Sequence, residues 1–154
     1  MLSKEFDTLP NIYLVGPMGA GKTTVGHELA TALGYSFIDT DAVISQLTGQ
    51  SITQLFASVG EDQFRQIESQ VLAKVSAYTN LAIATGGGIV LSRKNWSYLH
   101  HGLVVWLDVP VEILYARLAQ DTTRPLLQDV DLLEKLRSLL QQRQPLYKQA
   151  DLQI

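Results

Sequence analysis

The sequence predicts an α/β protein in which helices cover both faces of a parallel sheet, in a single domain of residues 1–154. The first observation behind this prediction is the repeated alternation of apolar runs of strand length with stretches of helical periodicity. The second is a phosphate-binding motif, G-x-x-x-x-G-K-[ST], at Gly16 to Thr23, with a strand pattern before it and a helical pattern after it. A chain of 154 residues can bury on the order of 68–70% of its unfolded surface, which is enough for a hydrophobic core.

The first two strands lie on either side of the motif. Ile12 to Val15 is predicted as a buried strand, and the motif follows it directly. The helix behind the motif has an apolar face of four residues: Val25, Leu29, Ala32 and Leu33. Gly34 is its expected cap, and Ser36 to Asp39 is the second strand.

Helices then occupy the chain up to the third strand. Short helices are expected at 42–47 and 52–59, and a longer amphipathic helix at 61–78. The buried face of the longer helix is formed by Phe64, Ile67, Val71 and Val75. Leu81 to Ala84 is the third strand, and it runs into Thr85 and three consecutive glycines.

The second half of the chain repeats the alternation. A helix near 93–99 precedes a strand at 103–107, and the next helix is apolar on one side. Residues 120–130 are polar and contain an Arg-Pro pair, whose proline stops a continuous helix. A last long helix, rich in leucine from Leu132 onward, is expected to reach Arg143 before Pro145, and 152–154 begin a final strand.

Composition excludes several classes of function. The chain has no cysteine, which excludes disulfides and thiolate metal sites and is compatible with a reducing compartment. The net charge of −3 argues against a general nucleic-acid surface, so a polyanionic substrate needs locally gathered cations. The longest apolar runs are of strand length, and residues 1–10 contain none, so neither a membrane span nor a signal peptide is predicted.

The phosphate-binding motif predicts a nucleotide site. Its glycines let the backbone turn around an anion, so that successive N–H groups point at phosphate oxygens. Lys22 adds a mobile positive charge for the β- and γ-phosphates, and the Thr23 hydroxyl can ligate Mg²⁺. The alternative is a glycine-rich turn that happens to precede a lysine. The strand before the motif and the helix after it make that alternative the weaker one.

Two further loops carry residues that suit an acceptor. Asp39 and Asp41 lie at the carboxyl end of the second strand, where open α/β sheets bind ligands. One could hold Mg²⁺ through water and the other could orient or deprotonate a hydroxyl, although an N-cap role would explain one of them. The glycine triplet is either a flexible turn or a loop where a small ligand touches bare backbone. The second is favoured, because Gly86 follows a strand expected beside the phosphate loop.

Each arginine has a structural explanation when it is taken alone. Arg65 follows Glu61 by four positions, the spacing of a surface ion pair worth only about 0.2–0.5 kcal/mol. Three others would serve equally as solvated helix or loop residues: Arg117, Arg124 and Arg143. The histidines have no ligand spacing with a carboxylate, so no zinc site is predicted. Trp96 and Trp106 are expected in the core.

Six motifs follow one another along the chain. They are Gly-Pro-Met-Gly-Ala-Gly-Lys-Thr-Thr at 16–24, Asp-Thr-Asp at 39–41, Gly-Glu-x-x-Phe-Arg-x-x-Glu at 60–68, Thr-Gly-Gly-Gly at 85–88, Arg-Pro-Leu-Leu at 124–127 and Arg-x-Pro-Leu-Tyr at 143–147. Each is modest alone, but the six in this order are highly specific. The chain therefore resembles the shikimate kinase family, in the nucleoside-monophosphate-kinase-like branch of the phosphate-loop folds, over nearly its whole length.

The resemblance implies a role for each motif. The ATP-binding residues would be Gly19, Ala20, Gly21, Lys22, Thr23, Thr24, Arg117 and Arg124, with Arg117 against adenine and Arg124 as the lid arginine on the phosphates. The shikimate-binding residues would be Asp41, Arg65, Gly86, Gly87, Gly88 and Arg143, with both arginines on the carboxylate and Gly87 on a hydroxyl. Thr23 and, through water, Asp39 would hold Mg²⁺. The catalytic residues would be Lys22, Asp41 and Arg124, with Asp41 as the candidate base.

The resemblance also implies a fold and an activity. The fold would be a three-layer α/β/α arrangement around a five-stranded parallel sheet of order 2-3-1-4-5, with a mobile lid at 120–130. The activity would be transfer of the ATP γ-phosphate to the 3-hydroxyl of shikimate, in chorismate and aromatic amino acid biosynthesis, by a cytoplasmic monomer that binds neither nucleic acid nor membrane. Relatives continue past the last strand with an adenine-contacting loop and a terminal helix. The chain is therefore expected to be either a fragment or a weaker nucleotide binder.

Two alternatives remain at this point. One is a kinase for another small molecule, such as gluconate or a nucleoside monophosphate. Such a kinase has no reason to retain Asp41, Arg65, the glycine triplet and Arg143 together. The other is a nonenzymatic nucleotide-binding relative, which should have lost a catalytic position, and none is lost.

Overall fold

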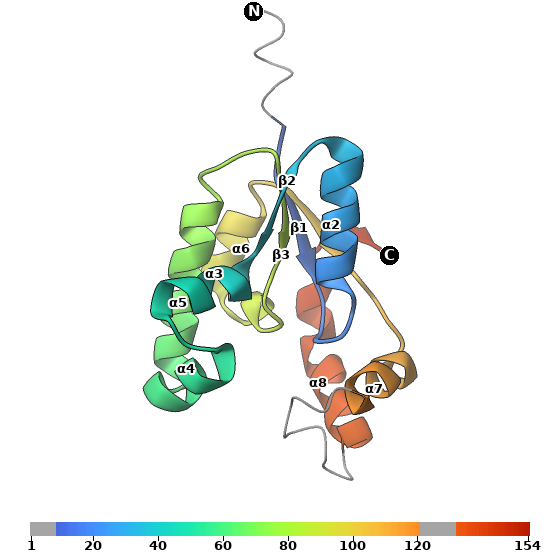
Figure 1. Ribbon diagram of the computed structural model, residues 1–154. Helices are drawn as coiled ribbons and strands as arrows, with labels where there is room; N and C mark the ends of the chain where they lie inside the picture. Colours follow the sequence, from blue (N-terminus) through green and yellow to red (C-terminus); the bar gives the residue numbers. More distant parts are fainter. Residues whose placement is uncertain (1–8, 121–131) are drawn as a thin grey trace, which may run out of the picture.

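The computed structural model describes residues 9–120 and 132–154, which contain a five-stranded parallel sheet (Figure 1). Its strands are β1 (Ile12–Val15), β2 (Ser36–Asp39), β3 (Leu81–Ala84), β4 (Leu103–Trp106) and β5 (Leu152–Gln153). They lie in the order β2-β3-β1-β4-β5, and every neighbouring pair is parallel, so the predicted fold class and strand order are confirmed. Because the strands are parallel, the loops after β1, β2 and β3 lie at one edge of the sheet.

Helices make the connections between the strands. Helix α2 (Lys22–Leu33) follows β1 and covers one face of the sheet (Figure 1). The β2–β3 connection contains α3 (Thr40–Thr48), α4 (Ile52–Val59) and α5 (Glu61–Val75). The β3–β4 connection contains the 3₁₀ helix η1 (Ile89–Leu91) and α6 (Arg93–Leu99). Between β4 and β5 lie α7 (Val111–Ala119) and α8 (Leu132–Tyr147).

The hydrophobic core forms one cluster on each face of the sheet, because successive side chains of a strand point to opposite faces. Tyr13 and Val15 join the cluster that includes residues of α5, α6 and α8, whereas Leu14 joins the cluster that includes α2 and α7. Trp96 and Trp106 are each 5% exposed, as expected for core residues. The sheet is thus packed on both faces, which fixes the strand ends that carry the loops.

Helix α2 packs on the sheet through a different face from the one predicted. Gly26 and Ala30 are its buried residues, whereas Ala32 and Leu33, which were placed on the apolar face, are exposed. A Cβ on Gly26 would lie 2.5 Å from the Phe37 ring, so the helix approaches β2 along its small residues. Apolar periodicity alone favours the face with the larger side chains, and it therefore missed this close contact.

Helix α8 runs through Pro145 to Tyr147, rather than ending before the proline as predicted. A proline inside a helix costs about 3 kcal/mol. Tyr147 is fully buried and stacks on Trp106, with ring centroids 5.4 Å apart. Burying an aromatic side chain of about 150–250 Å² at about 25 cal/mol per Å² contributes roughly 4–6 kcal/mol, which outweighs the proline.

Two other departures from the prediction are local. Helix α5 ends at Val75, because the N–H groups of residues 77 and 78 bond to carbonyls three positions back. The 3₁₀ helix η1 was not predicted, and side chains of α6 hold it in place. Asn95 Nδ2 donates to the Ile89 carbonyl at 2.9 Å, and Trp96 Nε1 donates to the Val90 carbonyl at 3.0 Å.

The lid predicted at 120–130 lies outside the described residues apart from Gln120, and Arg124 lies outside them as well. None of the described helices has the length and apolar character that crossing a bilayer requires.

Candidate active site

The phosphate-binding loop connects β1 to the first turn of α2. Gly19 and Gly21 have φ angles of 85° and 96°, which glycine adopts without steric cost, and Gly21 is the N-cap of α2. The Lys22 ammonium donates to the carbonyl of Gly16 and, at 3.3 Å, to that of Pro17. The loop therefore combines a helix N-terminus with a cation, which together favour an anion such as a phosphate.

The other residues predicted to contact the nucleotide lie around the same loop. Arg117 on α7 donates from Nη1 to the carbonyl of Gly19 at 2.7 Å. Ala20 is 6% exposed, and Thr24 is exposed in the first turn of α2. The structure therefore brings Arg117 onto the loop of residues 19–24, while Arg124 lies outside the described residues.

Asp39 connects the phosphate loop to the end of β2. Its Oδ2 accepts a hydrogen bond from the Thr23 hydroxyl at 3.2 Å. Its Oδ1 accepts the backbone N–H groups of Asp41 and Ala42, at 2.9 and 3.3 Å, and so caps α3. Asp39 thus has the cap role that was considered as an alternative, and it also reaches the phosphate loop.

The oxygens at this junction suit a hard cation. A hydroxyl and a carboxylate are ligands that Mg²⁺ accepts, and Mg²⁺ in kinases takes its other ligands from water and phosphates. Among residues 9–120 and 132–154, no group of three His, Cys, Asp or Glu side chains could hold a metal ion. The protein residues therefore fit Mg²⁺ only as part of a nucleotide complex.

The glycine triplet after β3 lets charged side chains lie against bare backbone. A Cβ on Gly86 would lie 2.6 Å from Asp41 Oδ1 and 3.1 Å from Glu68 Oε2. A Cβ on Gly88 would overlap the Arg65 guanidinium. A larger residue at Gly86 or Gly88 would displace these side chains. The two glycines therefore let Asp41, Glu68 and Arg65 lie together at the end of β3.

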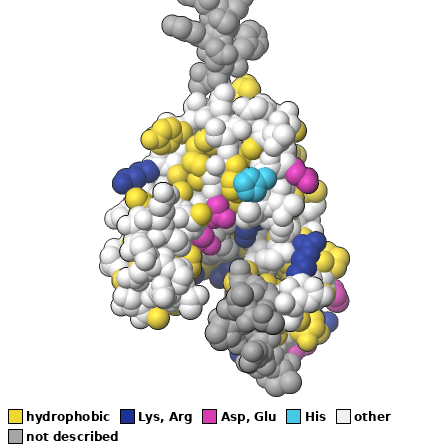
Figure 2. All heavy atoms as spheres, viewed as in Figure 1, with side chains coloured by type: hydrophobic (Ala, Val, Ile, Leu, Met, Phe, Trp, Pro, Cys, Tyr) yellow, Lys and Arg dark blue, Asp and Glu magenta, His cyan; other side chains and the backbone are white. Residues whose placement is uncertain are grey.

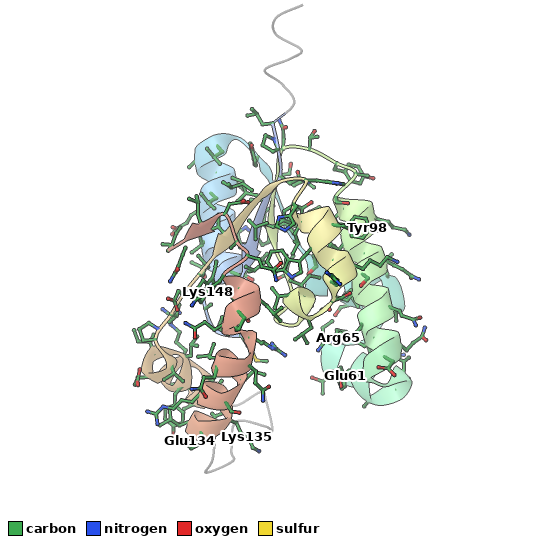
Figure 3. All side chains as sticks on the ribbon, turned by 180° about the vertical axis from the view of Figure 1, so that it is seen from behind. Glu61, Arg65, Tyr98, Glu134, Lys135 and Lys148 are labelled. Carbon is green, nitrogen blue, oxygen red and sulfur yellow. The ribbon has the colours of Figure 1, made fainter. Side chains whose placement is uncertain are left out.

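Arg65 on α5 and Arg143 on α8 meet at this loop. Arg65 Nη1 lies 3.1 Å from Glu68 Oε1, and Arg65 Nη2 lies 3.9 Å from Glu61, one turn away on the same helix (Figure 3). Arg143 Nη1 donates to the Gly87 carbonyl at 3.0 Å. Within the described part of the chain, the Nε of each arginine is buried and has no hydrogen-bond partner. The Nε atoms therefore have hydrogen-bonding capacity that their described neighbours do not use.

Glu68 is a site residue to which the sequence analysis gave no role. It is 1% exposed, and burial raises the pKa of its carboxyl. Arg65 and Arg143 lower that pKa, and Asp41 raises it, so the charges of all three act on Glu68. Its position three residues after Arg65 and at the end of the third motif was the available signal. A glutamate on an amphipathic helix is ordinarily expected to be exposed, which hid its role.

A hollow marks the site on the surface. Figure 2 shows it beside the part of the molecule that contains α3, α4 and α5. Acidic side chains gather at its upper margin, and Lys or Arg side chains lie below them. The phosphate loop and the charged cluster thus share one side of the molecule.

A model of the family described as shikimate kinase matches residues 18–154. The chain belongs to the shikimate kinase family. A shikimate kinase from Nostoc sp. is 72% identical over 144 residues, which cover 94% of this chain and 80% of that protein. The shikimate kinase from Trichormus variabilis is 71% identical, with the same coverage. A solved structure described as shikimate kinase from Acinetobacter baumannii in complex with shikimate has a TM-score of 0.90 and 48% identity, and the match covers 99% of this chain and 86% of that one. Membership of the shikimate kinase family makes this chain an ATP-dependent kinase.

Proposed function

We propose that the chain transfers the γ-phosphate of ATP to the 3-hydroxyl of shikimate, giving shikimate 3-phosphate. The observation that carries this proposal is the pair of arginines beside the glycine triplet. Arg65 and Arg143 come from different helices, and the Nε donor of each is buried without a partner among the described residues. Shikimate has one carboxylate, and two planar guanidinium groups suit its two oxygens through forked hydrogen bonds. A neutral sugar would offer the two guanidinium groups no opposite charge.

Asp41 is the proposed partner of the acceptor hydroxyl. Its Oδ1 lies against Gly86, on the same loop that carries the Gly87 carbonyl bonded to Arg143. An acceptor held by its carboxylate at the arginines would therefore direct its ring hydroxyls toward Asp41 and the backbone of Gly87. In the reaction, Asp41 would orient the attacking hydroxyl and take its proton.

On the nucleotide side, the backbone N–H groups of residues 19–24 and the Lys22 ammonium would bind the phosphates. Thr23 and, through water, Asp39 would hold Mg²⁺, which neutralises charge on the β- and γ-phosphates. Phosphoryl transfer depends mostly on positioning and on charge stabilisation, so Lys22 is the main catalytic contribution of this loop. Arg117 would lie beside the adenine, and Arg124 would contact the phosphates.

Four further properties stay predictions: a single kinase domain over residues 1–154, a monomeric state, a cytoplasmic location and the absence of a nucleic-acid partner. The net charge of −3 supports the last of these, because non-specific binding to nucleic acid depends on an excess of positive charge.

The proposal is tested by measuring phosphate transfer from ATP with purified protein. Shikimate, gluconate and a nucleoside monophosphate are offered separately at equal concentrations, and ADP release is followed together with the phosphorylated product. We expect product with shikimate only. ADP release without a phosphorylated acceptor, or faster transfer to gluconate, would contradict the proposed acceptor.

A further inference from the structure

Thr40 lies between the two aspartates to which the sequence analysis gave roles, and it received none itself. Its side chain is fully buried, whereas Asp39 and Asp41 on either side are partly exposed. It is the first residue of α3, directly after β2. A threonine buried so completely needs a partner for its hydroxyl, because burial of an unpaired hydroxyl is unfavourable.

The partner is the backbone of the glycine triplet. The N–H of Gly86 donates to Thr40 Oγ1 at 2.9 Å, across 46 positions of the chain, in a buried environment. Gly86 is also the residue whose missing side chain makes room for Asp41 and Glu68. The Thr40 hydroxyl therefore holds the first residue of the loop on which the acceptor is proposed to bind.

Three consecutive side chains thus contact both loops of the site. Asp39 accepts from Thr23 of the phosphate-loop helix, at 3.2 Å. Thr40 accepts a hydrogen bond from the N–H of Gly86 in the glycine loop. Asp41 Oδ1 lies close to Gly86, where a Cβ would leave it no room. The backbone between Asp39 and Asp41 is itself fixed by the cap that Asp39 makes to the Asp41 N–H at 2.9 Å. Thr40 is therefore the direct link between this rigid turn and the loop after β3.

We propose that Thr40 is a positioning residue for the acceptor site, and that its hydroxyl sets the place of the glycine triplet relative to Asp41 and the two arginines. The loop is sensitive to this placement. The Gly87 carbonyl receives Arg143 at 3.0 Å, and Gly88 lies directly against the Arg65 guanidinium. A shift at Gly86 moves both contacts. The inference rests on the proposed function, since the affected ligand is shikimate.

The alternative role for this hydrogen bond is structural, as a tie between the ends of β2 and β3. These strands are already paired in register from Ser36 with Leu81 to Asp39 with Ala84. A structural tie would change the fraction of folded enzyme, and so kcat, without changing the KM for one substrate. A positioning role changes the KM for shikimate and leaves the KM for ATP unchanged, because the hydrogen bond of the Thr40 hydroxyl is to Gly86 of the glycine loop.

The test compares Thr40→Val, Thr40→Ala and Thr40→Ser with the parent, with both substrates varied in the transfer assay. Valine retains the shape of threonine and removes the acceptor, whereas serine retains the acceptor. We expect Thr40→Val and Thr40→Ala to raise the KM for shikimate by about tenfold or more, the effect of losing a buried hydrogen bond, and to leave the KM for ATP within about twofold. Thr40→Ser should restore the KM for shikimate to within about threefold of the parent value.

Thr48→Val is the matched control, because Thr48 lies on the same helix and its hydroxyl donates to the Ile44 carbonyl at 2.8 Å, away from the glycine loop. It should retain both KM values. A KM for shikimate in Thr40→Val equal to that of the parent overturns the inference. Failure of both Thr40→Val and Thr40→Ala to fold, judged by circular dichroism, overturns it as well, since Thr40 is then a structural residue. A parent enzyme that does not phosphorylate shikimate would instead refute the proposed function, before any variant is compared.

Discussion

Arg65 is held by two carboxylates of very different exposure. Glu61 lies 3.9 Å away and its side chain is 62% exposed, whereas Glu68 lies 3.1 Å away and is 1% exposed. An exposed pair contributes about 0–1 kcal/mol at most, because water and salt screen it. The buried carboxylate therefore fixes the orientation of the guanidinium, and the pair suggested by the i,i+4 spacing is the lesser of the two.

The two arginines supply the first prediction. Arg65→Ala and Arg143→Ala should each weaken shikimate binding by roughly tenfold to a hundredfold or more, because a hydrogen bond to a charged group contributes about 1.5–3 kcal/mol. ATP binding should be unchanged. Replacement by lysine should still lose much of the affinity, because the charge remains but the fork is lost. Titration calorimetry with shikimate and with an ATP analogue measures both.

The double variant and one control complete this test. The effects of Arg65→Ala and Arg143→Ala should not add, because both residues share one ligand. Arg137→Ala is the control, since Arg137 is an exposed arginine of α8 that pairs with Glu134 and Glu112. If both single variants bind shikimate as tightly as the parent does, the acceptor is not held by its carboxylate, and the proposed acceptor is wrong.

Glu68 supplies a prediction about pH. Burial raises the pKa of Glu68 above its ordinary value of 4.5. At a pH between the ordinary and the raised pKa, the folded protein therefore holds a proton on Glu68 that the unfolded chain has released. The contribution of this proton to the free energy of unfolding is fully present at a pH below the ordinary pKa. It is lost as the pH rises through the raised pKa of Glu68. Glu68→Gln has no such proton, so its free energy of unfolding should increase relative to that of the parent as the pH rises from acid to neutral.

Urea denaturation of both proteins at a series of pH values measures this difference. Glu61→Gln is the control, because Glu61 faces the same arginine but is exposed. A difference between Glu68→Gln and the parent that falls with rising pH would mean that the arginines outweigh burial and that the pKa of Glu68 is lowered.

At the scale of whole elements, α8 is the least conventional part of the structure. Its last turn contains Pro145, which leaves the Gln141 carbonyl without its usual helical donor, and yet the turn continues to Tyr147. The last turn is therefore held by side-chain packing rather than by helix propensity, because Tyr147 packs against Trp106 of the sheet. The same turn begins with Arg143, so packing of the tyrosine also fixes the arginine.

Pro145→Ala should accordingly make the protein more stable, by about 2–2.6 kcal/mol. Alanine is favoured over proline by about 3 kcal/mol within a helix, and the greater freedom of the unfolded chain offsets about 0.4–1 kcal/mol of this. The midpoint of denaturation in urea measures the change, with Gln144→Ala as the neighbouring exposed control. A lower midpoint in Pro145→Ala would show that the proline itself is required by the packing of the last turn.

The elements also show where sequence reasoning succeeds and where it fails. Strands β1 to β4 could be placed closely, because short apolar runs between polar turns have few alternatives. The end of α8 and the buried face of α2 could not be placed. Each depends on a contact between residues distant in sequence, namely Tyr147 with Trp106 and Gly26 with Phe37. The charged loops could be located at one sheet edge, because each follows a strand that could be placed. The burial of Glu68 could not be predicted, because it depends on residues distant in sequence.

At the scale of the whole molecule, the two proposed binding regions share one sheet edge but have separate residues. The phosphate loop follows β1, and the glycine triplet follows β3, which pairs directly with β1. The Thr85 hydroxyl donates to the Leu14 carbonyl at 2.7 Å, so the two strand ends are fixed to each other. A change in one region should therefore spare binding in the other while the sheet stays folded.

Ligand-dependent unfolding tests this separation. A ligand at about 100 times its Kd stabilises the folded state by about 2.7 kcal/mol, which raises the Tm. In Lys22→Ala, an ATP analogue should raise the Tm much less than in the parent, and shikimate should raise it as much. In Arg65→Ala, shikimate should raise the Tm much less, and the ATP analogue should raise it as much. Lys22→Ala should also abolish phosphate transfer. Loss of both responses in either variant would show that the two regions are not independent.

The central place of β1 has a consequence for the synthesis of the chain. Leu14 is joined to Thr85, 71 positions later, and Val15 pairs with Trp106 of β4. At the usual rate of about 5–20 residues per second, the phosphate loop leaves the ribosome roughly 5–20 s before both strands that flank it. During that interval neither β3 nor β4 is complete beside the loop, so we expect a nascent chain to lack nucleotide affinity. The loop is translated early, but the strands that flank it on both sides are present only after Trp106 has emerged.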